Sequence, residues 1–321
     1  MTETASPTRR GRVLRSTAAL AVLLALVAYV VVQYMSGGGA PRCVVRSVDR
    51  VDSDSSGSGS GTSYELTPEM AANAATISAV GTTRGMPERA VTIALATALQ
   101  ESALRNIRHG DRDSLGLFQQ RPSQGWGTPQ QILDPVYSAG KFYDHLAEVP
   151  GYSRLPLTVA AQRVQRSGFP QAYAKHEPDA SLLAAALTGR ASAALTCTAG
   201  RQTGPGDPAK LRAELTRSFG AGVLPASGSG GAGADQLTVP VIAKAGAAGA
   251  GKGKSTGAAA GSASRRGWEL AHWAVAQASV LRIEEVWYSG QVWRADEADE
   301  GWTPTDTNAA ADAVRIRIAS R

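Results

Sequence analysis

One apolar helix constrains the fold of this chain more than any other segment. Residues 88–102, ERAVTIALATALQES, follow Pro87 and carry apolar side chains at most positions, which leaves almost no polar face. A helix that is apolar all round is buried on most of its sides. We therefore expect other helices around it, in a mainly α-helical domain over residues 64–200. The expected neighbours are 70–80, which Thr67 caps and Gly81 ends, and then 135–147, 157–166, 170–176 and 178–188.

The N-terminus predicts a membrane anchor. Residues 17–34, TAALAVLLALVAYVVVQY, contain no charged side chain and approach the roughly 20 residues that cross a bilayer core. Four arginines precede this run, so residues 1–16 are expected to form a cytoplasmic tail, with the bulk of the chain extracytoplasmic. A cleaved signal peptide is the alternative.

Only two cysteines occur, Cys43 and Cys197. An even count outside the cytoplasm suggests one disulfide bond, which would join the start of the exported region to the end of the helical domain. Two unpaired thiols remain the alternative.

The rest of the chain divides by composition. Residues 35–63 and 201–235 are predicted to be linkers, rich in glycine and small polar residues. Residues 236–321 are predicted to form a small α+β domain with a disordered Gly/Ala/Ser-rich insertion at 244–264. The expected strands are 237–243, a hairpin through Ser289 and Gly290, and a last strand, 314–320, at an edge or half exposed.

Several classes of function are not expected. The net charge of +6 comes largely from the first residues and from a Gly/Ala tract, so it predicts no surface for nucleic acid. The segment 246–256, GAAGAGKGKST, has glycine spacing near that of a phosphate-binding loop but never completes the pattern, so nucleotide binding is not predicted. No cysteine or histidine pair has the spacing of metal ligands, and neither a metal nor another cofactor is expected.

Glu101 ends the apolar helix between Leu99 and Leu104. A carboxylic acid that protonates a glycosidic oxygen must keep its proton near neutral pH, and apolar burial favours the protonated form. Glu101 is therefore a candidate general acid. A solvated glutamate at a helix end is the alternative.

The residues around Glu101 resemble the signature of lysozyme-like domains of the soluble lytic transglycosylase type. The pair Glu101-Ser102 ends a helix, and the segment Gly116-Leu117-Phe118-Gln119 begins fifteen residues later, as in that family. Residues 132–143 resemble the next family segment, with Asp134-Pro135 leading into a helix. The resemblance covers about residues 64–200. In detail, this segment most resembles the lysozyme-like domains of membrane-anchored actinobacterial cell-wall proteins.

The resemblance implies a peptidoglycan-cleaving glycosidase. Glu101 would act as general acid and then as base on a muramyl–glucosaminyl linkage, completed by a sugar hydroxyl or a water molecule. Ser102 would orient Glu101, and Gln119 would bind an acetamido group. Phe118 or Tyr143 would wall a sugar subsite, although core packing is the favoured role for Phe118. Asp111 and Asp113 are candidates for a second carboxylate, but a charged surface loop is favoured, so substrate-assisted cleavage is expected.

Two departures from family patterns keep an alternative open. The third family segment, usually A-x-N-A-G, is not reproduced at 162–166. Residues 265–321 resemble a domain found behind wall-acting modules, carried by Gly267-Trp268, Ala271-His272-Trp273, 286–290, 292–294 and Gly301-Trp302. The fuller family ends on a histidine-rich strand, but residues 312–316 carry alanine and arginine there, so this domain is expected to be non-catalytic. The whole chain could accordingly be a peptidoglycan-binding or scaffold protein on a degenerate lysozyme-like fold.

Overall fold

The computed structural model describes residues 20–31, 40–47, 62–169, 171–198, 200, 204–225, 235–242, 256–305 and 311–320. The chain separates into two units, Met1–Ala40 and Pro41–Arg321. In the first unit, residues 20–31 are helical, with exposed apolar side chains such as Leu23 and Val27. None of the helices in the described ranges is both long and apolar enough to span a bilayer. The ends of the predicted anchor, 17–19 and 32–34, lie outside the described residues.

Helices make up most of the second unit up to residue 219. The predicted apolar helix is α3, Glu88–Ser102, and the helix before it is α2, Pro68–Thr83. Thr67 caps α2 as predicted, because its side chain accepts a hydrogen bond from the Met70 backbone N–H at 3.3 Å. The other helices are α4 (Pro129–Ile132), α5 (Pro135–Ala147), α6 (Leu157–Gln165), α7 (Glu177–Leu187) and α8 (Pro208–Phe219). Single 3-10 turns lie at Pro122–Gln124, Tyr152–Arg154, Ala174–His176 and Ala221–Val223.

Helix α8 lies inside the segment predicted to be a linker, 201–235. Asp207 caps its first turn, and Leu211, Leu215 and Phe219 form a buried stripe at helical spacing. The stripe is narrow, and the opposite face is polar. The segment therefore has linker-like composition although it contributes to the core.

A small sheet that the sequence did not predict closes one side of the helices. Its order is β2-β1-β3, with β1 (Cys43–Arg46) antiparallel both to β2 (Ser63–Leu66) and to β3 (Leu195–Cys197). Cys43 and Cys197 are directly opposite in the register and form a disulfide bond. The predicted pairing of the two cysteines is therefore confirmed. The expectation of a linker throughout 35–63 is wrong for β1, whose Cys43 and Val45 are buried.

The C-terminal part is a small antiparallel sheet packed on one long helix, which confirms the α+β prediction at that level. Five strands pair in the order β4-β8-β5-β6-β7. Their bounds are β4 (Gln236–Pro240), β5 (Ile283–Tyr288), β6 (Gln291–Arg294), β7 (Trp302–Pro304) and β8 (Ala313–Ile318). Ser289 and Gly290, both with positive φ, form the predicted hairpin turn between β5 and β6. Strand β8 alternates between buried and half-exposed residues as predicted, but it lies between β4 and β5 and not at an edge.

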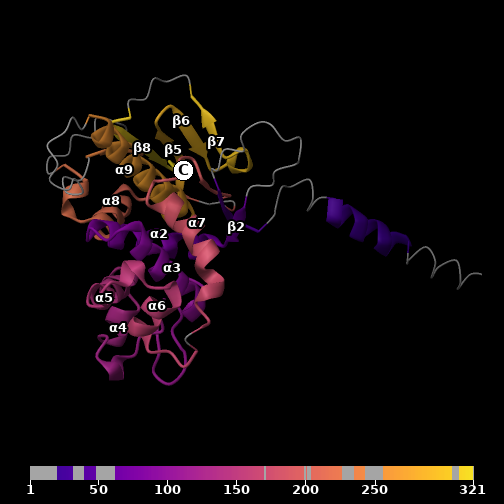
Figure 1. Ribbon diagram of the computed structural model, residues 1–321. Helices are drawn as coiled ribbons and strands as arrows, with labels where there is room; N and C mark the ends of the chain where they lie inside the picture. The colour runs from indigo at the N-terminus through magenta and orange to yellow at the C-terminus, as the bar shows by residue number, and fades with distance from the viewer. Residues whose placement is uncertain are drawn as a thin grey trace, which may run out of the picture. The chain divides into compact units, whose positions relative to one another are not determined.

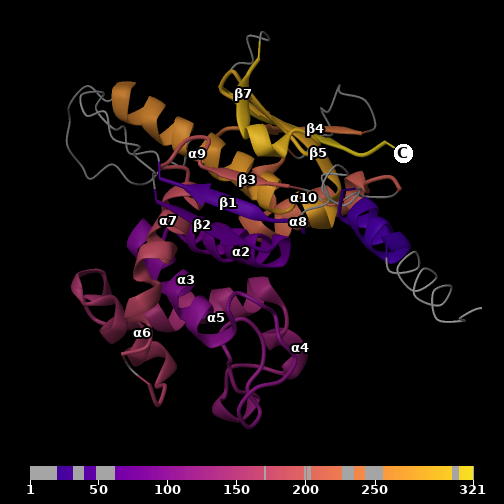
Figure 2. The same cartoon turned by 90° about the vertical axis from the view of Figure 1, so that its right-hand side faces the viewer.

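The long helix is α9, Thr256–Ala276, followed by the short α10, Ala278–Leu281, and a 3-10 turn at Ala298–Glu300. The disordered insertion predicted over 244–264 therefore does not extend past residue 255, because an alanine-rich stretch favours helix. The insertion residues before 256 lie outside the described part of the chain. Helix α9 contacts β5 and β8 on one side and α2, α7 and β3 on the other (Figure 1, Figure 2).

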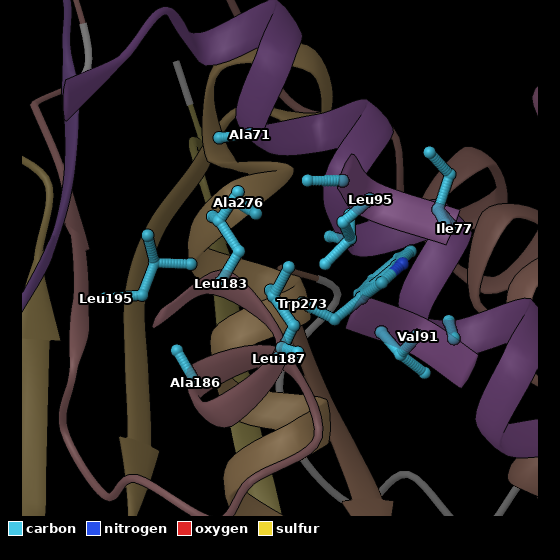
Figure 3. Close-up of a cluster of buried hydrophobic side chains, with 14 of the residues drawn as sticks. Ala71, Ile77, Val91, Leu95, Leu183, Ala186, Leu187, Leu195, Trp273 and Ala276 are labelled. Atoms are coloured by element: carbon cyan, nitrogen blue, oxygen red, sulfur yellow. The ribbon is translucent and has the colours of Figure 1, made fainter. Parts of the chain in front are cut away.

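The regions predicted as separate domains share one core. Trp273 of α9 is almost fully buried and lies among side chains of α2, α3 and α7, such as Ile77, Leu95 and Leu187 (Figure 3). The buried cluster continues from there into the five-stranded sheet. Residues 41–321 therefore form a single compact unit.

Candidate functional site

Glu101 lies one residue before the C-terminal end of α3. The helix stops there because Ala103 and Leu104 both adopt a left-handed backbone conformation, with φ of 53° and 59°. The Ala103 N–H closes the last turn on the carbonyls of Ala98 and Leu99. This left-handed cap turns the chain away from the helix axis. Glu101 is consequently half-buried at the end of an otherwise buried helix.

The segment 115–120 returns to the end of α3 as a tight loop. Ser102 Oγ donates a hydrogen bond to the Leu117 carbonyl at 2.8 Å, and Leu115 pairs with Gln120 in an isolated β-bridge. Gly116 has φ of +75°, and a Cβ atom at this position would lie 2.7 Å from the Ile132 carbonyl oxygen. Glycine is therefore required both by the backbone conformation and by the close approach.

Two side chains from later in the chain hold the Glu101 carboxyl group. The hydroxyl of Tyr173 donates to Glu101 Oε1 at 2.7 Å, and the Gln165 side chain also hydrogen-bonds to Glu101. Gln165 is fixed in turn, because its Nε2 donates to the Phe118 carbonyl at 2.7 Å. One amide therefore links the acid to the returning segment 115–120.

The environment of Glu101 raises its pKa. Burial is the largest cause, because it disfavours the ionised form, while the hydrogen bonds from Tyr173 and Gln165 act in the opposite direction. The pKa of Tyr173 is also raised, by burial and by the neighbouring carboxylate. Tyr173 therefore stays protonated and donates its hydrogen bond at neutral pH. The arrangement favours a carboxyl group that keeps its proton yet has two donors ready for the ionised form.

Glu101 forms part of the wall of a cleft of roughly 890 Å³. The other walls come from residues of the segments 111–114 and 119–126, from the end of α5 with residues 148–150, and from residues 163–169. Phe169 is 78% exposed and lies on this wall, as do Trp126 and His145, whose rings contact each other in a tilted arrangement with centroids 4.4 Å apart. The residues that line the cleft all belong to the helical part of the chain. The five-stranded sheet packs on α9 (Figure 1, Figure 2). The cleft is large enough for a chain of sugars or a peptide.

The structure brings only part of the predicted site together. Gln119 lines the cleft with Glu101, and its Nε2 donates to the Gly116 carbonyl at 3.2 Å. Ser102 is buried and bonds to the Ala98 and Leu117 carbonyls, so it positions the returning segment. Phe118 and Tyr143 do not line the cleft and are core residues.

Phe118 and Tyr143 do not reach the cleft because both side chains point into the protein core, Phe118 from the returning segment and Tyr143 from α5. Phe118 is fully buried and stacks on Phe142, with ring centroids 4.7 Å apart. The Tyr143 hydroxyl donates to the Ile77 carbonyl at 3.0 Å, and burial raises its pKa far above the ordinary range. Neither ring can wall a sugar subsite in this arrangement. Phe118 has the core-packing role that was favoured for it, and the predicted role of Tyr143 is corrected to core packing.

The loop carboxylates separate into two environments. Asp113 accepts hydrogen bonds from Arg121 Nε and from the Ser123 backbone N–H, both at 2.8 Å, and these hold its pKa well below the usual range. Asp113 therefore holds its loop to Arg121 and Ser123. Asp111 lines the cleft with Glu101, is strongly exposed, and lies 3.9 Å from the Arg112 guanidinium.

Gln165 and Tyr173 were not predicted from the sequence as site residues. Gln165 falls in the segment 162–166, which lacks the asparagine of the family pattern, but an amide side chain is present there and was the available signal. Tyr173 carries no such local signal. Its role depends on the packing of residues 171–176 against the end of α3, which is a long-range contact.

His272 is a packed core residue. It is fully buried, with Nδ1 bonded to the Ala186 carbonyl at 2.8 Å and Nε2 accepting from the Ala194 N–H at 3.2 Å. Burial lowers its pKa to about 4, so the ring is neutral and serves as a hydrogen-bonded spacer. Among the described residues, no three His, Cys, Asp or Glu side chains gather closely enough to bind a metal ion.

Comparison with known proteins identifies one segment. Residues 244–313 match a protein family described as VldE, C-terminal domain. The match covers about a fifth of the chain, from before α9 through the hairpin and β7. No match is found to a curated protein. The segment that carries Glu101 lies entirely outside the matched residues.

Proposed function

We propose that the chain is a peptidoglycan-cleaving glycosidase of the lytic transglycosylase type, with Glu101 as its general acid and base. One observation carries the proposal: a half-buried carboxyl group with a raised pKa lies in the wall of a cleft of roughly 890 Å³. Carboxyl groups with a raised pKa in a cleft are typical of catalytic acids. The sequence resemblance around Glu101 and Gly116 indicates the glycosidic linkage as the substrate.

In this mechanism Glu101 first gives its proton to the glycosidic oxygen as the bond to the leaving sugar breaks. The carboxylate that forms is stabilised by the hydrogen bonds from Tyr173 and Gln165. It then accepts a proton from a hydroxyl group of the remaining sugar as that oxygen closes on the anomeric carbon, which returns Glu101 to its starting state. If a water molecule attacks in place of the sugar hydroxyl, the product is hydrated and not anhydro.

Purified peptidoglycan provides the test. The full-length chain should release soluble fragments, and mass spectrometry should show anhydro ends. Glu101→Gln keeps the shape and should lower release by about 10²- to 10⁴-fold, the usual contribution of a general acid. Glu65→Gln, on the exposed side of β2, is the matched control and should behave as wild type. If neither wild type nor variant releases product while both bind insoluble wall, the wall-binding alternative replaces the enzyme.

We further propose that residues 17–34 anchor the protein in the cytoplasmic membrane, with residues 41–321 outside. The arginines before the apolar run support this orientation. The Cys43–Cys197 disulfide supports an oxidising compartment. Protease added to intact cells without their wall should digest the region after residue 41. Its protection would contradict the orientation.

A further inference from the structure

A basic stretch of the chain contains no acidic residue. Residues 149–176, between Glu148 and Glu177, include four side chains that are positively charged at neutral pH and neither an aspartate nor a glutamate. The four are Arg154, Arg163, Arg166 and Lys175, and all of them are exposed. No described carboxylate forms an ion pair with any of the four, and Glu177, the next acid along the chain, is paired with Arg89 at 2.6 Å. The positive charge of this stretch is therefore uncompensated at the surface.

The same stretch exposes apolar side chains. Of the large apolar residues described between 41 and 321, Phe169 is the most exposed, at 78%, and Val159 of α6 is exposed as well. Helix α6 turns Ala160, Ala161 and Val164 inward, so Val159 and Arg163, four residues apart, share its outer face. It contacts α3 and α5 and lies on the side of α3 away from the five-stranded sheet (Figure 1, Figure 2). Basic and apolar groups are thus presented together.

The combination of charge and exposed apolar surface narrows the class of partner. A soluble phosphate polymer would neutralise the arginines but leave Phe169 in water. An apolar protein surface would cover Phe169 and leave the charges without counterions. An anionic bilayer satisfies both, because its headgroups attract basic side chains and the acyl boundary directly beneath them accepts an aromatic ring.

We propose that the exposed side of residues 154–175 binds an anionic lipid bilayer, with Arg163 and Arg166 at the headgroup phosphates and Phe169 at the acyl boundary. This inference goes beyond the proposed function, because it requires no turnover by Glu101. The proposed anchor would keep the protein near such a surface. Arg163, Arg166 and Phe169 also line the cleft, so the contact would bring the mouth of the cleft to the headgroup layer.

Vesicle binding is measured on residues 41–321, without the anchor, since this part is one compact unit with its own core and disulfide bond. One set of vesicles is pure phosphatidylcholine, and the other also contains phosphatidylglycerol. Sedimentation gives the partition coefficient on each. We expect binding to the anionic vesicles to be on the order of a hundredfold tighter, from four basic residues near the surface. The difference should shrink as the salt concentration rises.

Two variants test the named side chains. The double variant Arg163→Gln/Arg166→Gln should bind anionic vesicles about tenfold more weakly. Its matched control is Arg46→Gln/Arg265→Gln, which removes the same charge from exposed positions outside the stretch and should bind as the unsubstituted protein does.

Phe169→Ala should also weaken binding about tenfold, because the ring no longer leaves water. Val280→Ala, at an exposed apolar position on α10, is its control and should have no effect. All these side chains are exposed, and unchanged thermal unfolding verifies that each variant is folded.

The outcomes separate this inference from the proposed function. Equal binding to both kinds of vesicle, or an equal loss in the arginine variant and its control, overturns the inference. Tighter binding to a soluble phosphate polymer than to vesicles, unaffected by Phe169→Ala, assigns the surface to a wall polymer and also overturns it. Anionic vesicle binding by a chain that releases no peptidoglycan fragments supports the inference and contradicts only the proposed function. Fragment release without vesicle binding does the reverse.

Discussion

Glu101 combines two influences that oppose each other at a single carboxyl group. Burial in the wall of the cleft raises its pKa, and hydrogen bonds from Tyr173 and Gln165 lower it. Burial is the larger of the two. The folded chain therefore holds this proton more strongly than the unfolded chain does, so the contribution of Glu101 to the free energy of unfolding falls as the pH rises through the folded pKa.

Glu101→Gln should therefore stabilise the fold at neutral pH. Because the folded pKa is raised above its ordinary 4.5, the favourable contribution of the protonated carboxyl is complete below that value and is lost as the pH rises through the folded pKa. Glutamine does not titrate and escapes this loss. We expect a gain of about 1 kcal/mol at pH 7, the order found when a strained active-site group is removed. Thermal unfolding of both proteins from pH 4 to pH 8 measures it, and a difference that does not shrink toward pH 4 would contradict the account.

Tyr173→Phe should shift the pH dependence of cleavage. The Tyr173 hydroxyl lowers the pKa of Glu101, so removing it should raise that pKa further. The alkaline limb of kcat/KM, where the general acid loses its proton, should then move to higher pH while maximal activity falls. Tyr152→Phe is the control, because Tyr152 is half-buried and does not bond to Glu101. A limb at the same pH in Tyr173→Phe and wild type would show that another group sets it.

At the scale of elements, the end of α3 and the returning segment 115–120 act as one piece. Ser102 ties them together, and Gln165 of α6 joins both to Glu101. The tight approach at Gly116 holds this piece against Ile132 at the end of α4.

Gly116→Ala should cost more than Gly85→Ala, although both glycines have nearly the same φ, 75° and 74°. Alanine in the left-handed region costs about 1–2 kcal/mol at either position. At Gly85 no atom lies within 4 Å of the added Cβ, whereas at Gly116 the Ile132 carbonyl oxygen would be 2.7 Å away. Gly116→Ala should therefore lose at least another 1 kcal/mol in chemical denaturation and lose activity as well. Equal stabilities of the two variants would show that the loop relaxes freely.

The elements predicted correctly from sequence are those with local signals. The bounds of α3 and α5 follow from Pro87, Asp134 and Pro135, and the hairpin follows from Ser289-Gly290. Helix α8 was missed because its stripe of three apolar residues is set in a polar segment. Strand β1 was missed because four residues carry no signal without their partner strands.

The candidate site was predictable to a similar extent. Glu101 and Gln119 were found from one continuous motif, and both line the cleft. The side on which Phe118 lies could not be read from that motif, because the packing of the loop against Phe142 decides it. Tyr173 lies 72 residues from Glu101 in sequence, and only the folded chain brings the two together.

At the scale of the whole molecule, residues 41–321 are joined by one core and one covalent link. Trp273 packs the C-terminal helix against α2 and α3, and the disulfide fixes β1 to β3 (Figure 3). A domain boundary was expected near residue 200. The sequence could not show that the two regions share one core, because this depends on α9, which contributes apolar surface to both sides.

Loss of the disulfide should destabilise the whole unit. The bond spans a sequence separation of 154 residues, for which the chain-entropy model gives about 5 kcal/mol. The double variant Cys43→Ala/Cys197→Ala should show a strongly lowered denaturation midpoint, with tryptophan fluorescence of the C-terminal part and helical circular dichroism lost together. Two separate transitions would contradict a single cooperative unit. A midpoint equal to that of wild type would contradict the stabilising role of the disulfide bond.

The measurement that tests the central claim most directly is the rate at which the full-length chain releases soluble fragments from purified peptidoglycan, compared with Glu101→Gln. A half-buried acid in the cleft wall predicts product with anhydro ends from the wild-type chain and a fall of about 10²- to 10⁴-fold in the variant, without loss of folded protein. Equal release by the two proteins would contradict the role of Glu101. No release by either, with wall binding retained, would make the cleft a binding site.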